Sequence, residues 1–382
     1  MPETYCFISA QYLPTAGGVE RYTYNMAKEL IHRGHRVIVV TSTLPGLSDY
    51  EVTFEGIIIY RVPALLLLNG RMPLSYPGKK WRDTCKALDQ QNISRIVIQT
   101  RLYTLSIMGM NYASKRHIPF ILIEHGTNYV GIQNKLLGFA ERQYENLMMS
   151  IARRKTTEFF TVSKAGFEWL KRFQIKAKGV LYNSVDPDAI QRYLSEPSED
   201  VRTRYSIPET HTLICYVGRL IPEKGVLQLI DSVLDMKELP ITLLIAGNGP
   251  LLSSLQSRKL PSNIILMGEI EQRDVMHLLR ASDIFCLPSD AEGFPTSILE
   301  AVICRCYVIT TTFGGAKELI STPEYGRSIS SNSKEAIKEA LLDAITHTEM
   351  RQIAINNAYQ RFFEQFTWNI TCDNLENLNW RH

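Results

Sequence analysis

Two glutamates, Glu292 and Glu300, stand eight positions apart in the stretch DAEGFPTSILEAV. Between them lies Pro295, a favoured first residue of a helix because its fixed φ suits that position. A helix that begins there leaves the backbone N–H groups of Thr296 and Ser297 without intrahelical partners, and such groups bind anions. Glu292 would then lie on the loop before the helix, and Glu300 about 7–8 Å further along its axis.

This spacing argues against a pair of glycosidase carboxylates. Such a pair acts on one glycosidic bond from about 5–9.5 Å apart and must face each other. Here an anion-binding helix start separates the two groups, so one extended ligand is the simpler interpretation. Its diphosphate would lie at the helix start, its sugar hydroxyls would reach Glu292, and its ribose hydroxyls would reach Glu300. A nucleotide sugar has these parts in this order. The alternative is an ordinary amphipathic helix with a solvated Glu300.

Two further loops carry polar or glycine signals after apolar runs. In GRLIPEKG, Arg219 and Lys224 stand five apart across a proline turn, and two cations on one loop can clamp a diphosphate. A surface loop with two solvated bases is the alternative. The later AGNGP is not a GxGxxG sequence, and no acidic residue follows about 20 positions on. A nicotinamide-dependent oxidoreductase is therefore disfavoured.

Apolar runs alternate with helical patterns in two series, which predicts an α/β protein with mostly parallel sheets. The first series includes TYCFISA, HRVIVVTS, SRIVIQT, PFILIEHG, EFFTVS and KGVLYN. The second includes HTLICYVGRL, ITLLIAGNG, NIILMGEI, DIFCLPS and CYVITT. We expect a Rossmann-like domain at 1–187, a second at 188–365, and a C-terminal segment at 366–382. Ligands of such sheets bind at the carboxyl ends of the strands.

Composition fits a two-domain globular protein of 382 residues, 45% hydrophobic and 21% charged. Seven cysteines without paired spacing favour a reducing, cytosolic compartment. No secretory signal or run of about 18 apolar residues is visible. Residues 1–186 hold 24 Lys+Arg and 14 Asp+Glu, a net +10, which leaves 18 and 25, a net −7, for the remainder. A basic half suits an anionic surface or a phosphorylated acceptor, and unequal solvated faces are the alternative.

The chain resembles the retaining glycosyltransferases of family four, which have the GT-B fold. The resemblance lies in several short stretches that occur in the same order as in that family. EGFPTSILE matches the E-x7-E sequence of that family, and GRLIPEKG resembles its diphosphate clamp. The remaining similar stretches are GGVE, EHGTN, VSK, YNSVD, AGNGP, MGEI and FTWNITCDNLENL. The resemblance implies two Rossmann-like domains facing across a cleft, with a C-terminal helix that crosses back to the first domain.

The resemblance also implies roles for individual residues. Arg219 and Lys224 would neutralise charge on the leaving diphosphate, Glu292 would orient the donor sugar, and His125 would hydrogen-bond it near the reacting carbon. These four are the expected catalytic residues. The expected donor-binding residues are Gly17, Gly18, Arg219, Lys224, Gly268, Ile270, Glu292, Gly293, Phe294, Pro295, Thr296, Ser297 and Glu300. No covalent nucleophile, cofactor or metal is expected, although DPD at 186–188 has the form DxD.

Three residue choices differ from the family pattern. Pro295 stands where many members have a small residue with an N–H group, so one amide donor is absent. Ser184 replaces a glycine in YNSVD, and CRCY replaces a segment that commonly carries glycine and proline. The first difference bears on contacts with the donor sugar, and the other two bear on packing.

The acceptor is expected on the basic first domain. Lys79, Lys80, Trp81 and Arg82, with ALLLL upstream and ARRK at 152–155, suit the interface of an anionic membrane. A basic helix end with a core tryptophan is the alternative. We therefore expect a cytoplasmic protein, peripheral on the inner face of the cytoplasmic membrane.

The expected reaction moves a hexose from a nucleotide sugar, UDP before GDP, to a saccharide linked to a polyprenyl diphosphate. Its context would be cell-surface polysaccharide synthesis, such as O-antigen or capsule. Alternatives are an epimerase acting on a UDP-sugar, a phosphorylase, or a non-catalytic protein that binds nucleotide sugars. Nucleic acid is not an expected partner because no aromatic-basic RNA-binding motif or zinc pattern is present.

Overall fold

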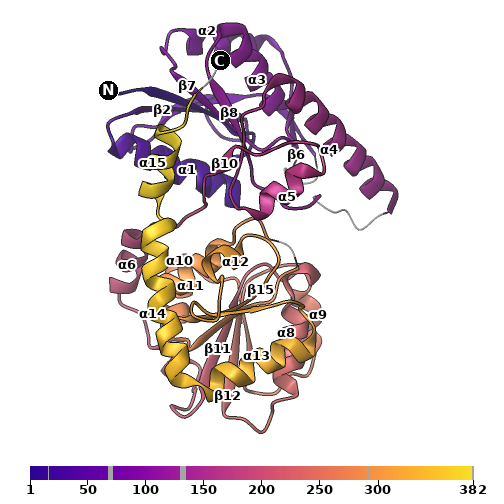
Figure 1. The fold of residues 1–382 in the computed structure, drawn as a ribbon, viewed down its shortest axis with the longest axis vertical. Coiled ribbons are helices and arrows are strands. Elements are labelled where there is room, and N and C mark those ends of the chain that lie inside the picture. The colour runs from indigo at the N-terminus through magenta and orange to yellow at the C-terminus, as the bar shows by residue number, and fades with distance from the viewer. Residues whose placement is uncertain (16, 68–71, 130–134, 291, 381–382) are drawn as a thin grey trace. The chain divides into compact units, whose positions relative to one another are not determined.

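A computed structural model of the chain describes residues 1–15, 17–67, 72–129, 135–290 and 292–380. The chain divides into two compact units (Figure 1). The first unit combines Met1–Asn183 with Trp368–His382, and the second is Ser184–Thr367. The sequence analysis placed these divisions at 187/188 and 365/366, and Arg381 and His382 lie outside the described residues.

The first unit is built on a largely parallel sheet of order β10-β9-β8-β7-β1-β2-β4-β3, in which only the β3–β4 pair is antiparallel among the strand pairs described. A separate antiparallel pair is formed by β5 and β6. The strands are β1 (Thr4–Ile8), β2 (Arg36–Ser42), β3 (Tyr50–Val52), β4 (Ile58–Val62), β5 (Ala64–Leu67), β6 (Met72–Ser75), β7 (Arg95–Gln99), β8 (Phe120–Glu124), β9 (Phe159–Thr161) and β10 (Gly179–Val180). The helices are α1 (Gly18–His32), α2 (Lys79–Asp89), α3 (Thr104–Arg116), α4 (Lys135–Lys155), α5 (Ala165–Lys171) and α15 (Trp368–Glu376).

The apolar runs of the first half form the expected buried strands, because a parallel sheet covered on both faces needs apolar side chains on both sides. The expected helix between the first two strands is α1, and Gly34 follows it with a φ of +86°, as a glycine after a helix end does. The strands β3 to β6 were not predicted. The apolar stretch that contains β4 and β5 includes Arg61 and Pro63, which obscured its strand pattern.

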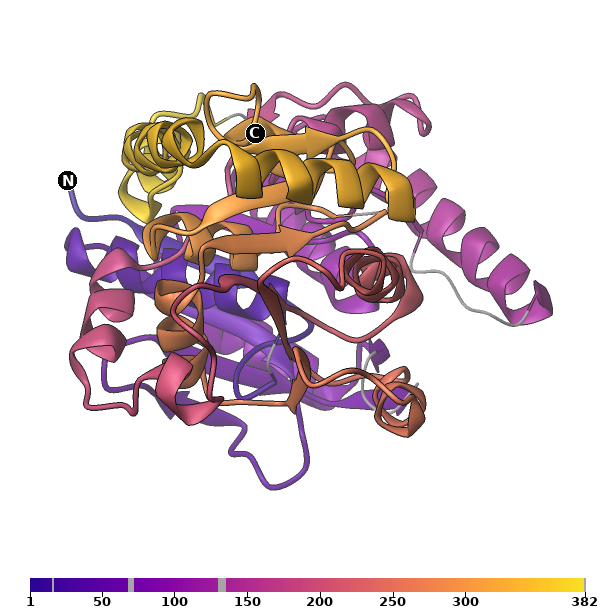
Figure 2. The same ribbon diagram turned by 90° about the horizontal axis from the view of Figure 1, so that it is seen from below.

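The second unit has a fully parallel sheet of order β13-β12-β11-β14-β15-β16, with helices on both sides (Figures 1 and 2). Its strands are β11 (Thr212–Val217), β12 (Ile241–Ala246), β13 (Ile264–Gly268), β14 (Ile284–Leu287), β15 (Tyr307–Thr311) and β16 (Arg327–Ile329). Its helices are α6 (Pro187–Ser195), α7 (Val201–Arg204), the 3-10 turn η1 (Pro222–Lys224), α8 (Val226–Leu234), α9 (Leu252–Ser257), α10 (Gln272–Ala281), α11 (Thr296–Ile303), α12 (Ala316–Leu319), α13 (Lys334–Thr346) and α14 (Thr348–Gln365). In chain order this sheet reads 3-2-1-4-5-6, the Rossmann arrangement, whose ligand crevice lies where the strand order reverses. That point is between β11 and β14.

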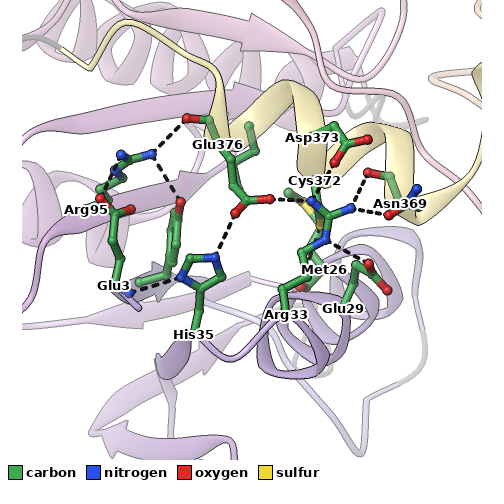
Figure 3. Close-up of polar contacts among 12 residues, drawn as sticks. Glu3, Met26, Glu29, Arg33, His35, Arg95, Asn369, Cys372, Asp373 and Glu376 are labelled. Atoms are coloured by element: carbon green, nitrogen blue, oxygen red, sulfur yellow. Dashed lines mark hydrogen bonds and ion pairs between the residues drawn. The ribbon is translucent and has the colours of Figure 1, made fainter. Parts of the chain in front are cut away.

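The last helix, α15, packs on α1 in the first unit, so the expected return of the C-terminal helix is confirmed. Trp368 packs edge-on against Tyr22 with ring centroids 5.3 Å apart. Arg33 forms ion pairs with Glu29 of its own helix and with Asp373 and Glu376 of α15 (Figure 3). These ion pairs attach α15 to α1, although the second unit lies between the two helices in the sequence.

Two features bear on the predicted membrane contact. Trp81 is 8% exposed and packs against Tyr112, so its prediction as an interfacial residue is wrong: the side chain fills the core between α2 and α3. Its neighbours Lys79, Lys80 and Arg82 are exposed. Among the described residues, no helix combines the length and apolar character needed to cross a membrane.

Candidate functional site

The loop that carries Arg219 follows β11 and is fixed by its neighbours. The Gly218 N–H donates to the Ala246 carbonyl at 3.1 Å, and the Tyr216 hydroxyl donates to the Arg219 carbonyl at 2.9 Å. With its backbone held in this way, Arg219 extends an exposed guanidinium from the carboxyl edge of the sheet. That position suits a group that must reach a charged ligand.

The same loop is locked to the loop after β14 on the other side of the switch point. The Asp290 N–H donates to the Glu223 carbonyl at 2.8 Å, and the Ser289 hydroxyl donates to the same oxygen at 3.1 Å. Gly225 has a φ of +72°, and a Cβ there would lie 2.2 Å from the Pro288 carbonyl oxygen. Only glycine therefore allows the two loops to approach this closely.

Lys224 and Glu292 meet across this contact. The ammonium group of Lys224 forms an ion pair with Oε1 of Glu292, and the two side chains are 21% and 11% exposed. Both residues were predicted to bind the donor, and the structure brings them together. A partly buried ion pair is screened by water and salt less than an exposed one. Burial chiefly, and then the Glu292 charge, raises the pKa of Tyr216 well above its usual value.

Two glycines, Gly314 and Gly315, contact the segment that contains Glu292 and Gly293. The sequence analysis did not single them out. The Gly315 N–H donates to the Gly293 carbonyl at 3.0 Å. Gly314 has a φ of +71°, and a Cβ there would lie 2.0 Å from the Glu292 carbonyl oxygen. Phe294 is buried and stacks on Phe366 at 5.3 Å between ring centroids. The backbone of the E-x7-E segment is thereby fixed independently of any ligand.

The helix within that segment is α11, and it begins at Thr296. The prediction that Pro295 is the first helical residue is wrong by one position, because Pro295 adopts an extended conformation, with a ψ of 122°, and occupies the N-cap. Thr296 and Ser297 are half-buried at the helix start, where the first N–H groups have no intrahelical carbonyl. Binding of an anion at the start of α11 stays a prediction.

Glu300 lies in α11 with 7% of its surface exposed. Its Oε1 atom accepts a hydrogen bond of 2.8 Å from Nε2 of Gln272, the first residue of α10. The alternative of a solvated Glu300 is therefore wrong. Gln272 gave no signal in the sequence, since a single glutamine after a strand has no characteristic spacing. It orients the carboxylate expected to bind ribose.

The AGNGP turn after β12 supports the same edge of the sheet. A Cβ on Gly247 would lie 1.9 Å from the Gly218 carbonyl oxygen, and one on Gly249 would lie 2.5 Å from the Leu220 carbonyl oxygen. The Gly247 N–H donates to the Gly268 carbonyl at 2.7 Å. Gly268, with a φ of +71°, and the half-buried Ile270 follow β13 on the next strand. These glycines let three strand-end loops pack together.

In the first unit, Gly17 and Gly18 stand at the start of α1. A Cβ on Gly17 would lie 2.3 Å from Oε2 of Glu20, so the Glu20 carboxylate rests against the glycine backbone. Glu20 is 4% exposed, and this burial raises its pKa. The Glu20 carboxylate therefore lies at the start of α1. This is the point at which Gly17 and Gly18 were expected to bind the donor.

His125 follows β8, and its ring is held by two contacts. Its Nε2 atom lies 2.6 Å from Oε1 of Gln99, the last residue of the neighbouring strand β7. The ring packs edge-on against Tyr22 with centroids 4.7 Å apart. Burial lowers the pKa of His125 to about 3, so the imidazole is neutral at physiological pH.

A buried charge cluster supports the backbone beside His125. The Arg101 guanidinium lies 2.7 Å from Oε1 of Glu124 and also pairs with Glu145, and all three side chains are at most 2% exposed. The same Glu124 oxygen accepts the Gly126 N–H at 2.9 Å. Because removing one partner would leave a buried charge uncompensated, the cluster holds the histidine loop firmly.

The DxD-like sequence has a structural role at its first residue. The Asp186 carboxylate accepts the Ala189 N–H at 3.0 Å and caps α6. Within the described ranges, no group of three or more His, Cys, Asp or Glu residues is arranged to hold a metal ion.

Comparisons with known proteins identify the family of the chain. Residues 16–189 match the model of Glycosyltransferase Family 4, and residues 197–361 match that of Glycosyl transferases group 1. The chain is 34% identical over 307 residues to the putative teichuronic acid biosynthesis glycosyltransferase TuaC of Bacillus subtilis, covering 80% of this chain and 74% of that one.

Solved structures share the fold. The sucrose-phosphate synthase of Thermosynechococcus elongatus superposes with a TM-score of 0.76 at 18% identity, over 98% of this chain and 97% of that one. Anabaena HepE in complex with UDP gives a TM-score of 0.74 at 17% identity, over 99% and 100% of the two chains.

Proposed function

The chain belongs to glycosyltransferase family 4, whose members are retaining enzymes of the GT-B fold, and we propose that it transfers a hexose from a UDP-sugar to a lipid-linked saccharide. The observation that carries this proposal is the ion pair of Lys224 and Glu292 at the switch point of the second sheet, on the loop that also carries Arg219. Two cations and a carboxylate beside a helix start match a diphosphate joined to a sugar. UDP is preferred because HepE has been solved with UDP and with UDP-glucose.

In the proposed reaction, the bond between the anomeric carbon of the sugar and the diphosphate oxygen breaks, and the acceptor oxygen bonds to the same face of that carbon. The acceptor proton passes to the departing diphosphate oxygen, so no protein nucleophile is required. Arg219 and Lys224 stabilise the negative charge that develops on the diphosphate, and fixed charges of this kind are usually the largest catalytic contribution. Glu292 accepts hydrogen bonds from sugar hydroxyls, and Glu300 accepts them from ribose.

The acceptor is proposed to be a saccharide linked to a polyprenyl diphosphate, used in the synthesis of a cell-surface polysaccharide such as O-antigen or capsule. The name of TuaC, which places that relative in teichuronic acid biosynthesis, supports such a context. The first unit is proposed to bind the acceptor, because the net charge of residues 1–186 is +10. The protein would then act on the inner face of the cytoplasmic membrane.

Exposed apolar side chains support the membrane contact. Leu65 and Leu67 of β5 are 63% and 45% exposed, and Tyr76 after β6 is 48% exposed. The exposed bases Lys79 and Lys80 follow in the sequence. Leu68, the last residue of the ALLLL stretch in the predicted interface, lies outside the described residues. Flotation with anionic liposomes at low salt should recover the protein in the lipid fraction, and the charge-reversing pair Lys79→Glu and Lys80→Glu should weaken the binding. Absence from the lipid fraction would reject this contact.

A thermal-shift series tests the donor assignment. A nucleotide at 100 times its dissociation constant adds about 2.7 kcal/mol to the free energy of unfolding. We expect stabilisation by UDP and UDP-sugars, unchanged by EDTA and lost in Arg219→Ala and Glu300→Ala. No shift with UDP, GDP or ADP would reject the nucleotide-sugar site, and a shift with GDP alone would reject the choice of UDP.

A further inference from the structure

His125 and Gln99 form a close polar contact at the carboxyl edge of the first sheet. Gln99 ends β7 and is fully buried, and His125 comes directly after β8. Gln99 is in register with Ile123, two residues before the histidine. The strand pairing thus sets the position of the amide relative to the imidazole, whose Nε2 atom lies 2.6 Å from Oε1 of Gln99.

We propose that Gln99 is a positioning residue that keeps His125 in the Nε2–H tautomer, and that the Nδ1 atom of His125 thereby accepts a hydrogen bond from a sugar hydroxyl. A carboxamide oxygen can only accept, so the Nε2 atom facing it must carry a proton. A neutral imidazole has one N–H, and its other nitrogen is then an acceptor. The inference rests on the proposed function and on the contact of His125 with the donor sugar that the family resemblance implies.

The surroundings of the ring keep this arrangement in place. Tyr22 packs edge-on against it at 88° between ring planes, and the Tyr22 hydroxyl donates to the Leu181 carbonyl at 3.0 Å. Tyr22 is fully buried, so a rotation of the imidazole that exchanged its nitrogens would have to displace a core side chain.

The charged groups nearest to the histidine are already engaged elsewhere. Glu124, the preceding residue, is 2% exposed and pairs with Arg101 at 2.7 Å. Its Oε1 atom also accepts the Gly126 N–H at 2.9 Å. Tyr22 is the titratable group that faces the ring from α1, and burial raises its pKa well above the usual value, so its hydroxyl stays neutral. The partner of the ring at Nε2 is a neutral amide, which does not favour the imidazolium form. Burial therefore dominates and lowers the pKa of His125 to about 3.

The consequence is a choice of ligand group. An acceptor at Nδ1 binds a hydroxyl, which can donate, and does not bind a diphosphate oxygen, which at neutral pH can only accept. His125 would thus contribute to recognition of a sugar hydroxyl and not of a phosphate.

Nitrogen-15 NMR of histidine-labelled protein tests the tautomer without any ligand. The His125→Gln variant assigns the signals of this one ring among the eight histidines. We expect the wild-type ring to be in the Nε2–H form and not to titrate between pH 5 and 8. A ring in the Nδ1–H form, or one that titrates near its ordinary pKa, would overturn the proposal.

Two variants at Gln99 extend the test. Gln99→Met removes the acceptor, and in the folded protein we expect a mixture of the two tautomers. Gln99→Glu places a carboxylate against Nε2, which should raise the histidine pKa into the range that NMR can follow. The KM for the donor sugar should then rise about tenfold for each pH unit below that pKa, because only the neutral ring can accept.

The outcomes separate this inference from the proposed function. Unchanged tautomers in Gln99→Met would overturn the positioning role of Gln99. If the expected tautomers are found but the KM of Gln99→Glu does not depend on pH, the contact between His125 and the sugar is rejected. Failure of every nucleotide to bind the wild-type protein would reject the proposed function and leave the tautomer result intact.

Discussion

Lys224 and Glu292 form an ion pair although they are 68 positions apart in the chain. They lie on loops after β11 and β14, the two strands that flank the switch point of the second sheet. Lys224 cannot give its full charge to a diphosphate while Glu292 holds it. Binding of the donor should therefore exchange the partners of both residues, with Lys224 turning to the phosphate and Glu292 to the sugar.

Replacing Glu292 with glutamine tests this exchange. Glu292→Gln should bind UDP several-fold more tightly, because Lys224 no longer has to leave a carboxylate. Transfer should nevertheless fall about 10- to 100-fold in kcat/KM, the usual value of a hydrogen bond to a charged group. Calorimetry with UDP and a transfer assay measure the two effects. Glu238→Gln, at a residue whose side chain is 87% exposed, removes the same charge elsewhere and serves as the control. Weaker binding of UDP by Glu292→Gln would contradict the exchange.

We expect Gln272 to contribute to binding of the nucleotide and not to the chemical step. Gln272→Ala removes the 2.8 Å hydrogen bond to Glu300, so we expect the donor KM to rise about tenfold with kcat within about twofold. Glu300→Gln should have a larger effect on the same parameter.

An analogue of the nucleotide identifies the group that Glu300 binds. If that group is the ribose, loss of the 2′-hydroxyl from UDP should weaken binding to the wild-type protein. The same loss should weaken binding to Glu300→Gln much less, since the two changes remove the same interaction. Fully additive losses of binding would place the contact of Glu300 elsewhere on the donor.

Gly314 should be required for activity although its residue type carries no chemistry. In Gly314→Ala, the new methyl group would lie 2.0 Å from the Glu292 carbonyl oxygen, so the backbone of the sugar-binding loop must move. A displacement of about 1 Å at such a site can lower the rate about 100-fold.

The control for this variant is Gly46→Ala. Gly46 also has a positive φ, of +81°, but a Cβ there has nothing within 4 Å. The control therefore introduces the unfavourable backbone conformation, about 1 kcal/mol, without the collision. Equal activity of the two alanine variants would show that the loop tolerates the displacement.

The contacts of Glu376 in α15 with Arg33 and His35 should stabilise the fold less in acid. Burial raises the pKa of Glu376, but hydrogen bonds from His35 and Arg33 outweigh it and hold that pKa below its usual value of 4.5. A lowered carboxylate pKa stabilises the fold above the unfolded value, and this stabilisation is lost as pH falls through the folded value. Glu376→Gln should lower the Tm at pH 7 by about 2–4 °C, and the difference should vanish below the folded pKa of Glu376.

Calorimetry across that pH range measures the difference. Glu168→Gln breaks an exposed pair with Lys171 in the same unit and should leave the curve nearly unchanged. A Tm difference that persists undiminished in acid would show that Glu376 acts through packing and not through its charge.

The sequence was sufficient to predict the elements that apolar burial dictates. β12 is buried throughout, and its run ITLLIA has no polar interruption longer than one residue. The residues at strand ends were also accessible, because polar side chains after such runs must meet at one edge of a parallel sheet. The positions of Arg219, Lys224 and Glu292 after β11 and β14 were predicted in this way, and their role in binding the donor stays a prediction.

Residues that act through a neighbour could not be found from the sequence. Gln99 and Gln272 matter only because strand register and helix packing bring their amides to His125 and Glu300. Gly314 matters because its loop returns to Glu292, a closeness that no local pattern encodes. Trp81 shows the opposite failure: an aromatic among bases suits a membrane interface and a core equally well, and only the position of Tyr112 decides between them.

The attachment of α15 to the first unit has a consequence for synthesis of the chain. The second unit, Ser184–Thr367, is continuous, so all of its residues leave the ribosome before α15 does. Residues Met1–Asn183 of the first unit precede the second unit, but α1 lacks its partner, and the contacts of Tyr22 and Arg33 with α15 are unmade, until Trp368–Glu376 has emerged. The unit that is translated first is therefore the one that is completed last, and ribosome-bound chains ending before Trp368 should expose the α1 surface to chaperones.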